Sequence, residues 1–371
     1  MDLPSEPVDF LIIGGGSAGC ALASRLSEDP ATRVLLAEAG RDVTPANMPS
    51  VLASAYPGRT YFQTEWLWPS LQASRGDSGT NQPTEPWFYE RARILGGGSS
   101  INGICANRGS PFDYDEWAAK GARGWSWPEV LPYFKKLETD ADFGEPLHGK
   151  SGPVPIQRHR RSDWTGFTRT MAKVFGDMGY AMQEDQNGTW ADGVFPTTFN
   201  VDQQNRRGSA ALVYLSAEVR RRPNLTVVTD MPVDRLVIKG GRVEAACFTQ
   251  NGQSVTIAAR QVIVSTGALQ SPVVLMKSGI GPGAHLANMV SRCTRTGRAS
   301  ARICRSIRIS ASPAICIHRR DCRLARIIIC RRCCAIPPAS TAFRPVTCMS
   351  RSRHAAAGMR WRGGSARSVS G

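Results

Sequence analysis

The stretch VDFLIIGGGSAGCALASRLSEDPATRVLLAEAG (residues 8–40) decides the fold of the first part of this chain. Residues 8–13 form a continuous apolar run, residues 17–26 place small and apolar side chains at helical spacing, and residues 34–38 form a second apolar run. A strand, a helix and a second strand in this order make a βαβ unit, whose parallel strands are buried on both faces. The sequence therefore predicts an α/β fold of Rossmann type.

Three glycines stand between the first strand and the helix in the order G-x-G-x-x-G. Gly14 permits the tight turn, Gly16 lets the backbone approach a pyrophosphate, and Gly19 lets helix and strand pack closely. Ser17 begins the helix, whose free N–H groups favour negative charge. Glu38 ends the second strand, where a carboxylate can accept ribose hydroxyls. The motif predicts a dinucleotide site without separating FAD from NAD; the alternative is a glycine turn in an unrelated α/β protein.

The formal net charge of +16 belongs to one end of the chain. Residues 289–371 contain 18 arginines, no lysine and one acid, which leaves 28 basic and 29 acidic residues in the rest. The first 288 residues therefore have the charge of a near-neutral protein, and we expect neither nucleic acid nor a membrane surface as a partner.

Cysteine usage and the N-terminus indicate the compartment. Eight of the 11 cysteines lie in residues 289–371, and the three earlier ones fit a reducing environment without a disulfide framework. MDLPSEPVDF lacks the basic start of a signal peptide, and no apolar run has the length of a membrane span. We expect a cytoplasmic protein.

Loops, helices and strands alternate beyond residue 40. Residues 41–92 are rich in Pro, Trp and Tyr and are predicted to form long loops over a site, and residues 114–138 are predicted to be helical. A second glycine-rich turn, LGGGSS, begins at Leu95. Strand-like alternation is found at residues 223–229, 233–240, 242–249 and 253–259. A further apolar strand, at residues 261–264, precedes a glycine turn and a helix.

Three motifs together resemble the glucose-methanol-choline (GMC) family of FAD-dependent oxidoreductases. DFLIIGGGSAG with EAG is similar to its FAD fingerprint, ARILGGGSSINGICANRGSPFDYD (92–115) to its first signature, and GALQSPVVLMKSGIG (267–281) to its second. The resemblance covers residues 8 to about 288. The flanking sequences look most like hydroxymethylfurfural and aryl-alcohol oxidases and bacterial alcohol and choline dehydrogenases.

The resemblance implies that a primary alcohol loses a proton to a histidine base and a hydride to flavin N5, with FAD as cofactor. It also implies which residues hold FAD. They are Gly14, Gly16, Ser17, Gly19, Glu38, Arg93, Leu95, Gly96, Gly97, Ser100, Asn102, Gly103, Ala106 and Val233.

Some of these implications depend on single positions. Where some members carry a flavin-linked histidine this chain has Ile101, so we expect non-covalent FAD. Asn102 could alternatively cap a turn. Four tryptophans could line an aromatic substrate pocket, although such residues are more often core or loop anchors: Trp66, Trp68, Trp87 and Trp117.

No histidine matches the family's C-terminal catalytic pair, so no catalytic residue is predicted. We assign surface or structural roles to all five, which are His148, His159, His285, His318 and His354. No metal site is predicted either. The CRRCC stretch at 330–334 contains one C-x-x-C, whereas zinc sites usually show two spaced pairs.

Residues 289–371 are predicted to be a disordered, aberrant tail. Read one base out of frame with suitably chosen codons, residues 295–309 can spell a segment that resembles the family's continuation, which indicates a frameshift near residues 289–291. An arginine-rich tail could instead bind nucleic acid, but it lacks lysine and interleaved aromatic residues.

We expect an FAD-binding domain from residues 1–160 and 206–288, and between them, at 161–205, part of a substrate domain with an antiparallel sheet. The expected function is FAD-dependent oxidation of a small-molecule alcohol, with little turnover in this chain. One alternative is a non-catalytic flavin-binding fragment with a basic tail, and another is a fragment that does not fold because an apolar sheet face stays exposed.

Overall fold

The computed structural model describes residues 3–54, 59–60, 63–75, 85–283, 285–286 and, for the backbone, 328–329. The chain divides into two units, Met1–Ile329 and Cys330–Gly371, and the described residues all belong to the first. The predictions for residues 289–371 therefore lie outside the described residues, apart from the short strand at 328–329.

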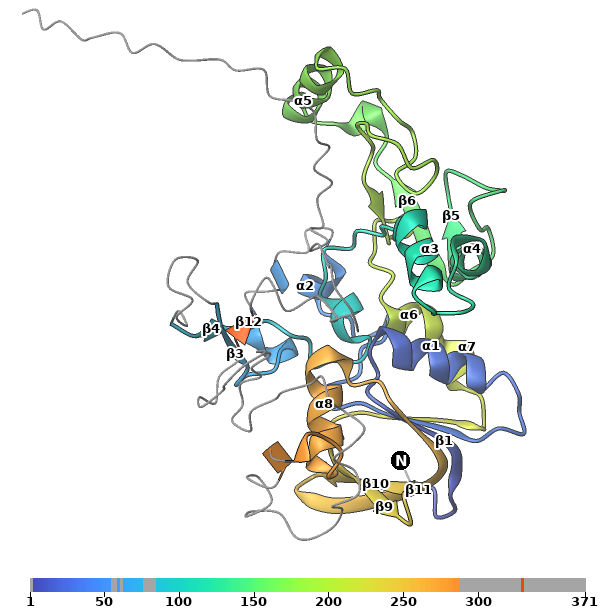
Figure 1. Ribbon diagram of the computed structural model, residues 1–371, viewed down its shortest axis with the longest axis vertical. Helices are drawn as coiled ribbons and strands as arrows, with labels where there is room; N and C mark the ends of the chain where they lie inside the picture. Colours follow the sequence, from blue (N-terminus) through green and yellow to red (C-terminus); the bar gives the residue numbers. More distant parts are fainter. Residues whose placement is uncertain are drawn as a thin grey trace, which may run out of the picture. The chain divides into compact units, whose positions relative to one another are not determined.

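A six-stranded sheet forms the centre of the first unit (Figure 1), in the order β8-β2-β1-β11-β10-β9. The first four of these strands are parallel where they pair, and β10 is antiparallel to both of its neighbours. The strands are β1 (Val8–Ile13), β2 (Val34–Ala37), β8 (Leu225–Val228), β9 (Val233–Lys239), β10 (Arg242–Gln250) and β11 (Gln253–Val264). The predicted α/β class is confirmed.

Strand β11 is longer than predicted. The sequence predicted two strands, at 253–259 and 261–264, but the structure has one continuous strand. Its first half pairs antiparallel with β10 and its second half, from Ala259, pairs parallel with β1. Arg260 sits in the middle and forms an ion pair with Asp9 on β1, 3.0 Å between Nη1 and Oδ1. A polar residue on an exposed side does not end a strand, and no glycine or proline interrupts this one.

Alternate side chains of β1 and β2 enter two separate cores. Leu11 and Ile13 pack with Val274 of helix α8 (Gly267–Lys277). Ile12 packs instead with Ala23 of helix α1 (Ser17–Leu26). The sheet is thus covered on both faces, as Figure 1 shows for α1 and α8. Burying one leucine, isoleucine or valine side chain fully contributes about 1.5–3 kcal/mol to the free energy of unfolding.

A second, smaller sheet is built from β5 (Glu138–Asp140), β6 (Val154–Arg158) and β7 (Thr198–Phe199). Strands β6 and β7 pair antiparallel, whereas β5 runs parallel to β6. The sheet uses residues on both sides of the boundary expected at 160/161, and that boundary stays a prediction.

Three helices belong to the same part of the chain: α3 (Pro111–Ala119), α4 (Trp127–Leu137) and α5 (Gly166–Asp177). Helix α3 begins before the helical segment predicted at 114. The hydroxyl of Ser110 accepts a hydrogen bond from the Phe112 N–H, and Pro111 occupies a first-turn position where its missing N–H has no cost.

The remaining elements are short. They are α2 (Ser50–Ala53), α6 (Ala210–Tyr214), α7 (Ala217–Arg220), 3-10 turns at Thr64–Trp66, Gly97–Ser100 and Arg161–Asp163, and a third sheet of β3 (Gln72–Arg75), β4 (Trp87–Phe88) and β12 (Ile328–Ile329). Among the described residues, no helix combines the length and the apolar character needed to cross a bilayer.

Gly19 is the glycine on which the packing of α1 against β1 depends. A Cβ at this position would collide with the carbonyl oxygen of Gly14. We expect Gly19→Ala to lower the free energy of unfolding by about 1–3 kcal/mol, measured by urea denaturation. Gly176→Ala on the exposed side of α5 is the matched control, because its Cβ would meet no described atom within 4 Å. Equal stability of both variants would contradict this account.

Candidate functional site

The first glycine turn joins β1 to α1. Gly14 has φ +98°, and a Cβ there would lie 2.7 Å from the backbone oxygen of Ser265, so only glycine fits. At Gly16 the surroundings are the opposite: a Cβ would meet no described atom within 4 Å. In the described part of the chain no side chain caps the first turn of α1, and that turn holds no acid. Its N–H groups therefore face open space that suits an anionic group.

Glu38 is buried directly behind this turn. Its Oε2 accepts a hydrogen bond of 2.7 Å from the Gly15 N–H, and its Oε1 accepts one of 2.8 Å from the Gly40 N–H. Burial raises the pKa of Glu38, while these N–H bonds act in the opposite direction. The Glu38 carboxyl thus binds the backbone at Gly15 and at Gly40. It also lies where the sequence predicts that a ribose hydroxyl binds. Each oxygen can accept a second hydrogen bond.

The second glycine turn lies directly on the first. The Gly96 N–H donates to the Gly15 carbonyl at 2.7 Å, and a Cβ on Gly97 would stand 2.8 Å from the Gly16 Cα. Gly96 and Gly97 both have positive φ, +89° and +54°. Leu95 is fully buried beneath the turn, and the buried Ser100 hydroxyl donates to the Leu95 carbonyl. Two segments predicted separately therefore form one backbone cradle.

Most of the predicted cofactor residues come together here. Arg93 donates from its Nε to the carbonyl of Ala39, the residue after Glu38, at 3.1 Å. Val233 begins β9 two residues after Met231, whose N–H donates to the Glu38 carbonyl. Asn102 and Gly103 are exposed on the outer side of the second turn, and Ser17 is exposed at the start of α1. Ala106 lies farther along, where its N–H pairs with Thr198 of the second sheet. Their roles toward FAD stay predictions.

The position before Asn102 and the tryptophans have other surroundings. Ile101 is buried in a core cluster with Leu67 and Ile94. Trp66 belongs to that cluster, Trp68 and Trp87 pack around Leu71, and Trp117 is exposed on α3 beside Tyr114. The four tryptophans do not line one pocket.

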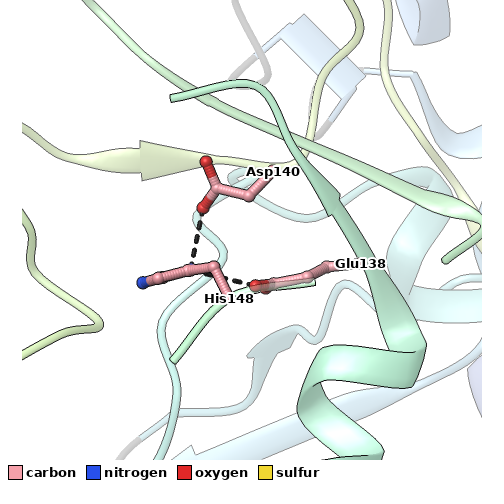
Figure 2. Close-up of side chains that lie close together, drawn as sticks. All are labelled: Glu138, Asp140 and His148. Atoms are coloured by element: carbon pink, nitrogen blue, oxygen red, sulfur yellow. Dashed lines mark hydrogen bonds and ion pairs between the residues drawn. The ribbon is translucent and has the colours of Figure 1, made fainter. Parts of the chain in front are cut away.

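A buried ionic cluster lies between β5 and the following loop, and sequence reasoning missed it. We call it the Glu138 cluster; its members are Glu138, Asp140, His148, Asp185, Arg108 and Arg158. Figure 2 shows the His148 ring with one nitrogen turned toward both carboxylates of β5. His148 Nδ1 lies 2.9 Å from Glu138 Oε1 and 3.0 Å from Asp140 Oδ2, and Nε2 lies 2.7 Å from Asp185 Oδ2.

Two arginines complete the cluster. Arg108 Nη2 lies 2.6 Å from Glu138 Oε1, and Arg158 bridges Asp140 and Asp185 with its two Nη atoms at 2.9 and 2.7 Å. Three carboxylates therefore meet two guanidinium groups and one imidazole. Burial alone would lower the pKa of His148, but its hydrogen bonds to Asp140, Asp185 and Glu138 raise that pKa to about 10, so the ring is cationic at neutral pH. The three cations balance the three carboxylates of the cluster, and a fourth carboxylate, on the exposed Asp142, lies 3.4 Å from Arg158 Nη1.

Charge balance bears on whether the cluster binds a metal. Glu138, Asp140 and His148 are residue types that ligate metals, and their ligand atoms lie within 4.8 Å of one another. A divalent cation would have to displace guanidinium groups that already satisfy the carboxylates. The geometry therefore favours a structural ion-pair network. The prediction of no metal stays a prediction.

The other described histidines lie elsewhere. His159 is exposed, and its ring packs on Phe199 with centroids 4.9 Å apart. His285 is partly buried, which lowers its pKa. His148 was assigned a surface or structural role, and the structure selects the structural one. His318 and His354 lie outside the described residues.

The comparisons with known proteins agree with this geometry. A family model described as GMC oxidoreductase matches residues 8–303. The chain belongs to this family. It is 43% identical over 283 residues to 5-(hydroxymethyl)furfural oxidase of Methylovorus sp. (strain MP688), covering 75% of this chain and 53% of the relative. It is 36% identical over 298 residues to oxygen-dependent choline dehydrogenase of Paraburkholderia phymatum, covering 77% and 49%.

A solved FAD-dependent oxidoreductase from Chaetomium thermophilum shares the fold, with a TM-score of 0.67, 26% sequence identity, and coverage of 76% of this chain and 49% of that one. The comparisons thus confirm the GMC resemblance and FAD as the cofactor of this fold. The match extends past residue 288, where the resemblance was expected to end. The chain spans about half the length of the curated relatives it matches.

The pKa of His148 predicts how stability depends on pH. Its folded pKa of about 10 exceeds the ordinary 6.5, so its contribution is complete below pH 6.5 and is lost as the pH rises toward 10. We expect the free energy of unfolding to fall over this range, and His148→Gln to flatten that slope, in urea titrations followed by tryptophan fluorescence.

His159→Gln is the control for this experiment, because the exposed His159 ring contacts no member of the Glu138 cluster in the contacts described above. Its slope should match that of the unsubstituted protein.

The two aspartates determine the behaviour at acid pH. Burial raises the pKa of Asp140 and Asp185, but hydrogen bonds from His148 and the charge of Arg158 lower it, and the net result lies below the ordinary 3.8. Their contribution is present above that value and is lost below it. A slope unchanged by His148→Gln would show that the ring is not charged in the folded protein.

Proposed function

We propose that this chain binds FAD non-covalently and is the flavin-binding part of an oxidoreductase acting on the CH–OH group of a primary alcohol. One observation carries the proposal: two glycine turns meet through the Gly96–Gly15 hydrogen bond, beside the open start of α1. At Gly16 a Cβ would meet no described atom within 4 Å, which leaves room beside the backbone for an anionic dinucleotide.

The chemistry divides between cofactor and chain. When bound, FAD supplies the hydride acceptor. The first turn of α1 would hold the pyrophosphate, and Glu38 would accept ribose hydroxyls with the lone pairs that Gly15 and Gly40 leave free. The 95–103 loop would lie beside the flavin. The names of the curated relatives, a hydroxymethylfurfural oxidase and a choline dehydrogenase, support a small alcohol as substrate.

We infer that this chain has little or no turnover. The family's base is a histidine, and the three described histidines are committed elsewhere or lie far along the chain from the cradle: His148 in the Glu138 cluster, His159 against Phe199, and His285 after α8. The same observation favours a second candidate, a flavin-binding protein without catalysis. Expectations about residues 289–371, including the frameshift, remain proposals.

FAD binding has a sharp test at Gly16. Its φ of −73° and ψ of −166° are accessible to other residues, and its Cβ would meet open space. We expect Gly16→Val to retain the melting temperature of the FAD-free protein but to raise the Kd for FAD more than tenfold, measured by quenching of flavin fluorescence, because the new side chain occupies the pyrophosphate's place. Gly176→Ala is the control. Unchanged FAD affinity in Gly16→Val would show that FAD does not bind at the cradle.

Alcohol oxidation is tested separately. The FAD-loaded protein would be mixed anaerobically with benzyl alcohol, choline or hydroxymethylfurfural, and its visible flavin absorbance followed. We expect the oxidised spectrum to persist, and dithionite to bleach it as a positive control. Bleaching by an alcohol would show a catalytic base that the described histidines do not supply, and would exclude the non-catalytic candidate.

A further inference from the structure

Arg207 is a buried arginine that no motif singled out. It lies in a hairpin between β7 and α6, closed by the Gly208 N–H to the Asn200 carbonyl at 3.1 Å and by Asn200 Nδ2 to the Gly208 carbonyl at 2.8 Å. The Arg207 residue is 4% exposed. The hairpin thus places the Arg207 guanidinium group inside the protein.

The guanidinium group holds the outer end of the 95–103 loop. Arg207 Nη1 donates to the Asn102 carbonyl at 2.8 Å, to Asn102 Oδ1 at 2.7 Å and to the Ser99 carbonyl at 3.2 Å. Its Nε donates to the Leu52 carbonyl at 3.3 Å. Hydrogen bonds from a charged donor are about twice as strong as neutral ones, and the planar fork fixes their direction.

The same segment holds the loop at a second point. The Ser99 hydroxyl accepts a hydrogen bond of 2.9 Å from the Ala210 N–H at the start of α6 and donates one of 2.6 Å to the Gly96 carbonyl. Residues 207–210 therefore form hydrogen bonds with the loop on both sides of Ser100. Ile104, just beyond the loop, has φ +55°, a left-handed conformation that is uncommon for a β-branched residue.

These contacts fix which way the Asn102 amide faces. Its Oδ1 lies 2.7 Å from Arg207 Nη1 and 3.1 Å from the Ile104 N–H. Both partners are donors, so the atom between them must be the oxygen, and the amide nitrogen must face the other way. The Asn102 residue as a whole is exposed. The amide nitrogen, with its two N–H donors, therefore points away from Arg207.

We propose that Arg207 is a positioning residue of the cofactor site, which orients the Asn102 amide so that its NH₂ group donates to an acceptor atom of the flavin. The proposal rests on the proposed function, because it needs FAD beside the 95–103 loop. Without Arg207 the Asn102 amide could turn, and the amide oxygen would then face and repel the acceptor atom of the flavin.

The experiment compares FAD affinity and the visible flavin spectrum across matched variants. Arg207→Met removes the donors but keeps an apolar stem, and we expect it to raise the Kd for FAD about tenfold or more. Asn102→Asp keeps an acceptor for Arg207 but removes the NH₂ group, and should raise the Kd similarly without lowering the melting temperature of the FAD-free protein. Arg206→Met is the control: this neighbouring arginine is exposed and pairs with Asp202.

A positioning role predicts non-additivity, because Arg207 acts through Asn102. Adding Arg207→Met to Asn102→Asp should weaken FAD binding little further, and both single variants should shift the flavin absorption band in the same direction. Arg206→Met should leave Kd and spectrum unchanged.

The outcomes separate this proposal from the proposed function. If the unsubstituted protein binds no FAD, the proposed function fails and this proposal with it. If it binds FAD and Asn102→Asp has the same Kd and spectrum, this proposal alone is overturned. Should Arg207→Met not fold, Asn102→Asp and Asn102→Leu decide the matter, since the Asn102 side chain is exposed and its replacement leaves the core intact.

Discussion

The close approach of two backbone turns is the constraint on which the rest of this structure depends. The Gly96 N–H reaches the Gly15 carbonyl, and Gly97 lies against Gly16 so tightly that a side chain on Gly97 could not fit. Because the first turn joins β1 to α1 and the second turn packs on the first, the contact depends on the βαβ unit. The same use of glycine leaves open space beside Gly16.

Around this contact, other groups hold the backbone from behind. Glu38 binds the N–H groups of Gly15 and Gly40, and Arg207 and Ser99 hold the outer end of the 95–103 loop. The Glu138 cluster supports the next segment of chain, because Asn187 accepts from the Arg108 N–H and donates to the Ala106 carbonyl. The cradle is thus fixed by polar groups that are themselves buried and partnered, which is how a rigid site is kept ready for its ligand.

How far the sequence predicts this structure depends on the range of the interactions. Strand β1 and helix α1 have the predicted bounds, Val8–Ile13 and Ser17–Leu26, because their periodicity is local. The continuity of β11 was not predicted, since it depends on having β10 beside one half and β1 beside the other. Arg207 and the Glu138 cluster carry no local signal: their partners lie 8 to 155 residues away, and a lone arginine or histidine in a loop is indistinguishable from a surface residue.

The measurement that tests the central claim most directly is a crystal structure of this chain with FAD. The account predicts the pyrophosphate at the first turn of α1 beside Gly16, a ribose hydroxyl on Glu38, and the flavin ring against the 95–103 loop, with the two glycine turns in contact as they are here. A flavin bound elsewhere, or turns that separate to admit it, would contradict the claim that the cradle is built before its ligand arrives.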